Sequence, residues 1–159
     1  MSTNTTTPNT SDSQKAMISK ILVAVDGSDA SMHAADYAVL MSNKYDAELY
    51  ALHVVHPADV DAISEPTQAS SYSVENTNQE SQKYLDKVKL KANENNIQLK
   101  TEVVSSVNAA GGIVDYAEAQ NVDLVVVGAR GKSGFRKLLL GSVASNVVTY
   151  AHCPVLVIK

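Results

Sequence analysis

Four residues between positions 128 and 142 have the spacing of a phosphate-binding loop. Gly128 and Gly131 follow an apolar run at 124–127, and nine residues separate Gly131 from Gly141, which Ser142 follows. Glycines just past a buried strand let the backbone turn sharply and approach a ligand, and the N–H groups that open a helix attract phosphate. We therefore expect nucleotide phosphates here. We also expect a Cβ at Gly131 or Gly141 to meet those phosphates or to block the required backbone angles.

Two better-known phosphate loops do not fit this segment. Gly131-Lys132-Ser133 looks like the end of a Walker A motif, but that motif needs a glycine where this chain has Val126. A Rossmann GxGxxG fingerprint follows the first strand of its domain, and the segment at 25–29 here reads Val-Asp-Gly-Ser-Asp. The sequence therefore favours neither of these folds.

The spacing G-x2-G-x9-G-(S/T), with Val-Ala-Val-Asp-Gly-Ser at 23–28, resembles the ATP-binding type of the universal stress protein family. The resemblance covers nearly all of residues 20–159. It implies that Ala24 lies near the base and Asp26 beside the nucleoside, and that the backbone of Val54 hydrogen-bonds adenine. It further implies that ribose and phosphates are held by Val127, Gly128, Gly131, Gly141, Ser142 and Val143.

One position departs from the family pattern. Binding members commonly carry a hydroxyl residue where this chain has Ala144, so a contact to the terminal phosphate is either missing or supplied by Ser145. Asp26 also has a second interpretation, because it could cap the helix that starts near Asp29. Its combination with the glycine loop favours contact with the ligand.

The resemblance implies a stress-response or signalling module that binds ATP together with Mg²⁺. Residues 128–150 contain no acidic side chain and no histidine that could activate water, so we expect little or no hydrolysis. Two alternatives stay open. One is a nucleotide-free interaction module of the same fold, which stays a candidate because Ala144 lacks the hydroxyl found in binding members. The other is a weak ATP hydrolase of the adenine-nucleotide hydrolase superfamily. The pyrophosphatases of that superfamily carry the motif SGGxDS after the first strand, whereas this chain has Asp-Gly-Ser-Asp-Ala-Ser at 26–31 and lacks the second glycine.

Composition narrows the class of protein. With 159 residues, of which 45% are hydrophobic, the chain has material for one domain and one core. A net charge of −4 argues against a nucleic-acid or anionic-membrane surface, although four of the 13 Lys and Arg lie within 130–137. No signal peptide and no apolar span of membrane length are present, so we expect a cytoplasmic protein.

Cysteine and histidine give no sign of a metal site. The single cysteine, Cys153, cannot form an internal disulfide, which fits a reducing cytosol, and we expect it to be a small buried core residue. His53 and His56 flank the end of a strand, where residues three apart point to opposite faces. The sequence therefore predicts no bound metal apart from the ion carried by the nucleotide.

The elements that position these residues alternate strictly along the chain. Residues 1–17 are polar and predict a disordered tail, leaving a domain over 18–159. Strands are expected at 20–25, 48–55, 97–104, 123–127 and 154–158. The first helix is expected to follow Asp29 or Ser31 as its cap, and further helices are expected at 75–96, 109–120 and 142–151. The polar stretch at 56–74 shows no period and predicts a mobile excursion or lid.

Apolar strands separated by helices predict an α/β fold, a doubly wound five-stranded parallel sheet of the adenine-nucleotide α-hydrolase-like type. Ligands of such sheets bind where the strand order reverses, and the distinctive loops follow the first and fourth strands. These two strands are therefore expected to be neighbours, which gives the order 3-2-1-4-5. The last strand is then an apolar edge, and we expect a homodimer paired through it, as the resemblance also implies.

Overall fold

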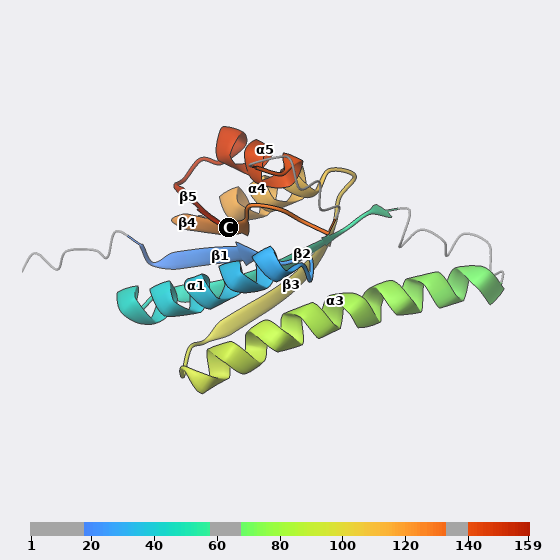
Figure 1. Ribbon diagram of the computed structural model, residues 1–159, viewed down its shortest axis with the longest axis horizontal. Coiled ribbons are helices and arrows are strands. Elements are labelled where there is room, and N and C mark those ends of the chain that lie inside the picture. Colours follow the sequence, from blue (N-terminus) through green and yellow to red (C-terminus); the bar gives the residue numbers. More distant parts are fainter. Residues whose placement is uncertain (1–17, 58–67, 133–139) are drawn as a thin grey trace, which may run out of the picture.

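The computed structural model describes residues 18–57, 68–132 and 140–159, with side chains left out for 68–77 (Figure 1). The predicted tail at 1–17 lies outside these residues. So do 58–67, in the middle of the predicted excursion, and Ser133 to Leu139 of the glycine loop.

The predicted sheet is confirmed. It contains β1 (Lys20–Ala24), β2 (Glu48–Val55), β3 (Leu99–Ser105), β4 (Leu124–Gly128) and β5 (Val155–Ile158) in the order β3-β2-β1-β4-β5. All neighbouring strands are parallel, and Ile21 of β1 pairs with Leu49 on one side and Leu124 on the other. The first and fourth strands are therefore direct neighbours.

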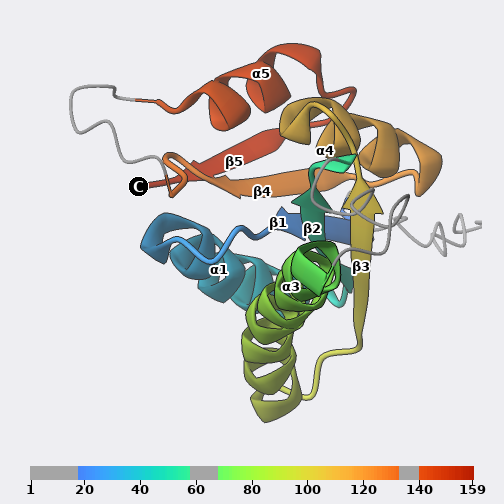
Figure 2. The ribbon, with the colours of Figure 1, turned by 90° about the vertical axis from the view of Figure 1, so that its right-hand side faces the viewer.

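Helices cover both faces of the sheet (Figure 2). On one face lie α1 (Asp29–Tyr45) and α3 (Gln68–Glu94), and on the other lie α4 (Ala109–Ala119) and α5 (Ser142–Tyr150). Successive strand residues point to opposite faces, so Ile21 and Val23 belong to the first core layer and Leu22 to the second. This double burial explains why the strands read as continuous apolar runs.

Several element ends differ from the sequence prediction. The predicted excursion ends earlier than expected, because α3 begins at Gln68 rather than Glu75 and projects beyond the sheet (Figure 1). Its first turns are mostly polar, so no apolar period marks them, but a helix nucleated further along can propagate through such residues. The cap of α1 is Ser28, whose hydroxyl accepts from the N–H of Ser31 at 3.2 Å, rather than Asp29 or Ser31.

The start of the described chain is anchored next to β4. Asp123 accepts from the N–H of Ser19 at 2.9 Å, from its hydroxyl at 2.7 Å and from the N–H of Lys20 at 2.9 Å. Cys153 is only partly buried, not fully buried as predicted, and packs against the layer of α4 and α5. Burial raises the pKa of its thiol.

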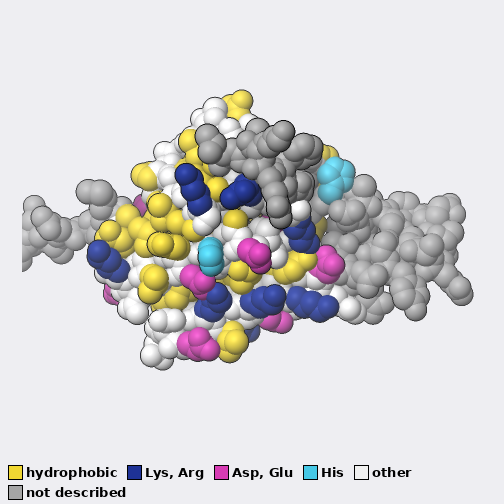
Figure 3. Space-filling view, in the orientation of Figure 1, with side chains coloured by type: hydrophobic (Ala, Val, Ile, Leu, Met, Phe, Trp, Pro, Cys, Tyr) yellow, Lys and Arg dark blue, Asp and Glu magenta, His cyan; other side chains and the backbone are white. Residues whose placement is uncertain are grey.

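The visible surface does not form a broad basic field. On the face that carries α1 and α3, aspartates and glutamates lie among the lysines and arginines (Figure 3). Within the described ranges, no helix is both long and apolar enough to cross a membrane.

Candidate nucleotide-binding site

One cavity of about 330 Å³ lies at the carboxyl ends of β1 and β4. Its lining includes all ten residues of the family pattern: Ala24, Asp26, Val54, Val127, Gly128, Gly131, Gly141, Ser142, Val143 and Ala144. It does not include Ser145, the alternative donor to the terminal phosphate. The chain leaves β1 toward β2 and leaves β4 toward β5, so the two connections diverge and leave a crevice between them. The strand order thus creates the cavity.

Other lining residues were not assigned to a ligand from the sequence, although Arg130 and Lys132 belong to the basic cluster at 130–137. They are Val25, Ser31, Leu52, His53, Ala109, Ile113, Ala129, Arg130 and Lys132. The pairing of β1 with β2 brings Leu52 and His53 to the cavity, and the packing of α4 brings Ala109 and Ile113, whereas Ala129, Arg130 and Lys132 belong to the glycine loop after β4.

The inner wall of the cavity is apolar. Leu52 is fully buried, and Val127, Ile113 and Ala144 are each at most 3% exposed. Ala24 and Val54 are partly buried against the same core layer. Such a wall suits a flat, weakly polar ring, as pockets for small molecules commonly combine apolar walls with a few polar groups.

The other end of the cavity is the N-terminus of α5. Its cap is Gly141, which has no side chain to accept from the first N–H groups of the helix, and the first helical bond runs from Ser145 N to Gly141 O at 2.9 Å. Gly141 to Ala144 all line the cavity. The positive end of the helix dipole and its free N–H groups therefore face the cavity, as an anion site requires.

The glycines are also needed for close contacts within the protein itself, and a collision between a Cβ and bound phosphates stays a prediction. A Cβ at Gly131 would lie 2.7 Å from Oδ2 of Asp26, and one at Gly128 would lie 2.7 Å from backbone atoms of Ala30 and Ser31. At Gly141 the nearest atom is the carbonyl oxygen of Ala129 at 3.2 Å. Neither Gly131 nor Gly141 has a positive φ, so the expectation that these two serve special backbone angles is wrong. They allow close approach of backbone to backbone or side chain.

Asp26 joins the turn after β1 to the glycine loop. Oδ1 accepts from the N–H of Ser28 at 2.9 Å and from its hydroxyl at 2.6 Å, and Oδ2 accepts from the N–H of Lys132 at 3.3 Å. Asp26 is therefore not the helix cap, but it holds the residue that is. Burial by itself raises the pKa of Asp26, but hydrogen bonds from Ser28, Ser31 and Lys132 outweigh it and place the pKa below its ordinary value of 3.8.

We expect Asp26→Asn to lower the melting temperature at neutral pH. We also expect the melting temperature of this variant to decrease less than that of wild type as the pH is lowered. Because the pKa is lower in the folded state, ionised Asp26 stabilises the fold above its ordinary pKa, and this contribution is lost as the pH falls through the folded value. Thermal melts between pH 7 and pH 3 measure this. Asp115→Asn, at an exposed position of α4, is the matched control. Identical pH profiles for wild type and Asp26→Asn would contradict the assignment.

His53 connects the ends of β1 and β2. Its Nδ1 lies 2.7 Å from the carbonyl oxygen of Val25, which makes that nitrogen a donor, and its ring meets the ring of Tyr84 edge-on at 5.4 Å. Across the described part of the chain, no three His, Cys, Asp or Glu side chains are arranged to hold a metal ion. The role of His53 here is thus to hold the rim of the cavity in place.

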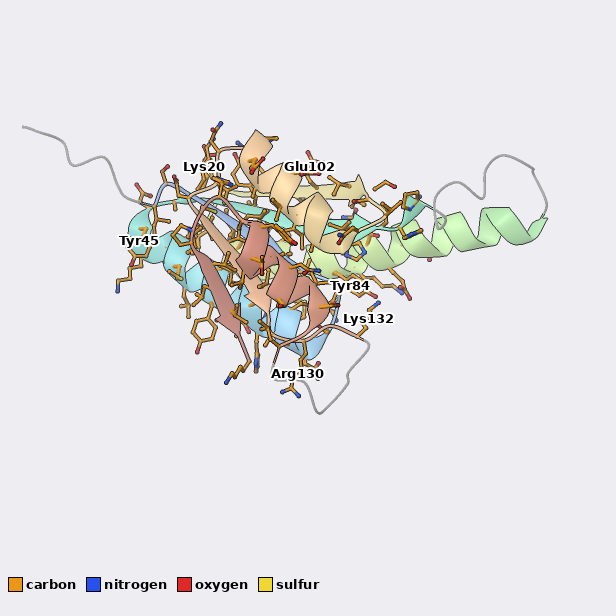
Figure 4. The ribbon with its side chains drawn as sticks, turned by 90° about the horizontal axis from the view of Figure 1, so that it is seen from above. Lys20, Tyr45, Tyr84, Glu102, Arg130 and Lys132 are labelled. Atoms are coloured by element: carbon orange, nitrogen blue, oxygen red, sulfur yellow. The ribbon has the colours of Figure 1, made fainter. Side chains whose placement is uncertain are left out.

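Lys132 links the glycine loop to α3 (Figure 4). Its Nζ donates to the hydroxyl of Tyr84 at 2.5 Å, lies 4.6 Å from the centre of the Tyr84 ring and is 3.7 Å from Oε2 of Glu80. The hydrogen bond to Tyr84 raises the pKa of Lys132, so its amine stays protonated. Arg130 also lines the cavity, whereas Arg136 and Lys137 lie outside the described residues.

The sequence model of the Universal stress protein family matches residues 17–159. Universal stress protein MJ0531 of Methanocaldococcus jannaschii is 41% identical over 141 residues, covering 88% of this chain and 81% of that protein. Universal stress protein YxiE of Bacillus subtilis is 36% identical over 149 residues, covering 90% and 100%.

Comparison with solved structures also points to universal stress proteins. The structure of universal stress protein UspA from Lactobacillus plantarum superposes with a TM-score of 0.75 at 31% identity, covering 89% of this chain and 98% of that one. The glycine spacing, the strand order and these similarities agree. The chain belongs to the universal stress protein family.

Proposed function

We propose that this protein binds ATP in the cavity between β1 and β4 and acts as a stress-response or signalling module. The observation that carries the proposal is that an apolar wall and an uncapped helix N-terminus meet in one cavity, lined by all ten residues of the family pattern. Proteins of this fold give further support. A universal stress protein was solved in complex with cAMP, and the one from Archaeoglobus fulgidus in complex with dAMP.

The two ends of the cavity suggest how the nucleotide would lie. The base would occupy the apolar wall near Leu52 and Val127, and the phosphates would reach Gly131 and the first turn of α5. Mg²⁺ would arrive with the phosphates, because the one carboxylate among the described lining residues, Asp26, already accepts three hydrogen bonds. Mg²⁺ commonly keeps several waters and binds through substrate phosphates, which fits this arrangement.

We infer that ATP turnover is slow. Of the described residues that line the cavity, the two that could act as a base are Asp26 and His53, and both are engaged in hydrogen bonds that hold the backbone. A base must reach the attacking water near the terminal phosphate. Fast steady turnover would instead support the hydrolase alternative.

Calorimetric titration with ATP, with and without Mg²⁺, tests the proposal directly. We expect saturable binding of one nucleotide per chain, and mass spectrometry of ligand released from gently purified protein should detect an adenine nucleotide. Lack of binding at millimolar Mg-ATP would leave the nucleotide-free interaction module as the better interpretation.

We further propose a homodimer formed through β5. Val125 N bonds Pro154 O at 3.0 Å and Ala129 N bonds Ile158 O at 2.6 Å, so the alternating backbone groups of Val155 and Val157 point away from β4. The helices that flank this edge expose large apolar side chains, namely Tyr37 and Leu40 on α1 and Val148 and Tyr150 on α5. An apolar edge strand of this kind can pair with the same strand of a second copy of the chain.

The cytoplasmic location, which we expect because the sequence shows no signal peptide and no apolar span of membrane length, stays a prediction.

We expect Val157→Pro to convert the dimer to a monomer, because proline removes an outward N–H that a partner strand would need. Light scattering after size exclusion measures the mass at micromolar concentration. Lys100→Gln, on the opposite edge strand β3, should leave the mass unchanged. A wild-type protein of monomeric mass would refute the dimer.

A further inference from the structure

The ammonium group of Lys132 lies between the cavity and α3. The backbone of Lys132 is fixed to Asp26, and its side chain crosses to Tyr84 and Glu80 while also lining the cavity. Figure 4 shows Lys132 and Tyr84 next to each other, and they are joined by a hydrogen bond. Lys132 directly follows Gly131, so any phosphate held at Gly131 and the start of α5 comes close to this cation.

Tyr84 and Glu80 bind the ammonium group of Lys132 more weakly than a phosphate group would. The Tyr84 hydroxyl is neutral, and the Glu80 side chain is 61% exposed and 3.7 Å away, where water screens the attraction. A phosphate group is dianionic or nearly so and forms charge-assisted hydrogen bonds of about twice the strength of neutral ones. A phosphate within reach would therefore draw the ammonium away from α3.

Tyr84 itself is held in place by other contacts. Its hydroxyl also bonds Oε2 of Glu80 at 3.2 Å, and its ring packs edge-on against His53 and directly over Gly27. Lys132 can therefore leave without carrying Tyr84 along. The contact between the glycine loop and α3 is broken by the movement of one side chain.

We propose that Lys132 selects nucleotides that carry a β- or γ-phosphate, and that Tyr84 and Glu80 are the acceptors that hold its ammonium when those phosphates are absent. The inference rests on the nucleotide binding proposed above and deepens it. A triphosphate breaks the contact between the loop and α3, whereas a monophosphate leaves it intact. The state of this contact then reports the number of phosphates on the bound nucleotide.

The first test measures the affinities of wild type and Lys132→Gln for ATP, ADP and AMP by calorimetry. We expect the variant to bind ATP about tenfold more weakly, with affinity for AMP changed by less than about twofold. The matched control is Lys87→Gln, which removes the same charge from an exposed position of α3. Equal losses for all three nucleotides, or no loss, would overturn the proposal.

The second test removes the competing acceptors. Tyr84→Phe and Glu80→Gln should each strengthen ATP binding by about two- to threefold and leave AMP binding unchanged, because the ammonium no longer has to be shared. A purely structural contact predicts the opposite, a loss of affinity for all three nucleotides. Circular dichroism confirms that the variants fold.

The failures of the two proposals are distinguishable. If wild type binds no nucleotide, both the nucleotide function and the selectivity of Lys132 are refuted. If wild type binds AMP and ATP, and Lys132→Gln leaves the ratio of their affinities unchanged, only the role of Lys132 is refuted.

Discussion

Replacing Gly141 by valine is expected to lower the affinity for Mg-ATP by at least about tenfold, the equivalent of roughly 1.4 kcal/mol, while the protein stays folded. Gly141 has φ −72° and ψ 163°, extended values that valine readily adopts. A Cβ there would lie 3.2 Å from the carbonyl oxygen of Ala129, so that neighbour must move by a few tenths of an ångström. The valine methyl groups would then fill the mouth of the phosphate end and cover the first N–H groups of α5.

The matched control is Gly111→Val in the first turn of α4. Gly111 does not line the cavity, and the nearest atom to an added Cβ is Cβ of Asn108 at 3.7 Å. Calorimetric titration of both variants gives the comparison, with urea unfolding to verify that each is folded. If Gly141→Val binds Mg-ATP as tightly as wild type, the phosphates are bound elsewhere.

Replacing Gly27 by alanine is expected to lower the free energy of unfolding by about 2–4 kcal/mol. Gly27 has φ +81°, which residues with a side chain rarely adopt, and an added Cβ would lie 2.2 Å from Cε1 of Tyr84. The Tyr84 ring, which packs against His53 and whose hydroxyl accepts from Lys132, would have to shift. The backbone strain and the collision therefore act together at this one position.

Urea denaturation of single and double variants separates the two causes. Combining Gly27→Ala with Tyr84→Ala removes the collision but keeps the positive φ, so we expect part of the loss to be recovered relative to the sum of the single changes. Gly111→Ala, at a helical position where an added Cβ makes only ordinary van der Waals contact with Asn108, should be neutral or slightly stabilising. Additive effects at Gly27 and Tyr84 would show that the ring contact does not matter.

Local sequence patterns predicted most of the sheet. The strands are buried on both faces, so their apolar runs stand out, and the unusual loops after the first and fourth strands identify those strands as neighbours. The start of α3 was misplaced because its first turns are polar, and a polar helix in this position has no apolar period.

The partners of the site residues were beyond prediction. Lys132 meets Tyr84 across 48 positions of the chain and its N–H meets Asp26 across 106. Such pairs depend on strand register and on how α3 lies against the sheet, and the spacing of residues along the chain predicts neither property. His53 shows the same limit, since its bond to Val25 depends on the pairing of β1 with β2.

The sequence by itself therefore determined the fold class, the strand order, the family and part of the cavity lining, because burial pattern and glycine spacing are local properties. Only the tertiary structure decided what those residues contact. It made Asp26 a link between two loops, and it placed a lysine where Tyr84 and Glu80 hold it beside the cavity. These contacts join segments distant in the chain, and packing alone brings them within hydrogen-bonding distance.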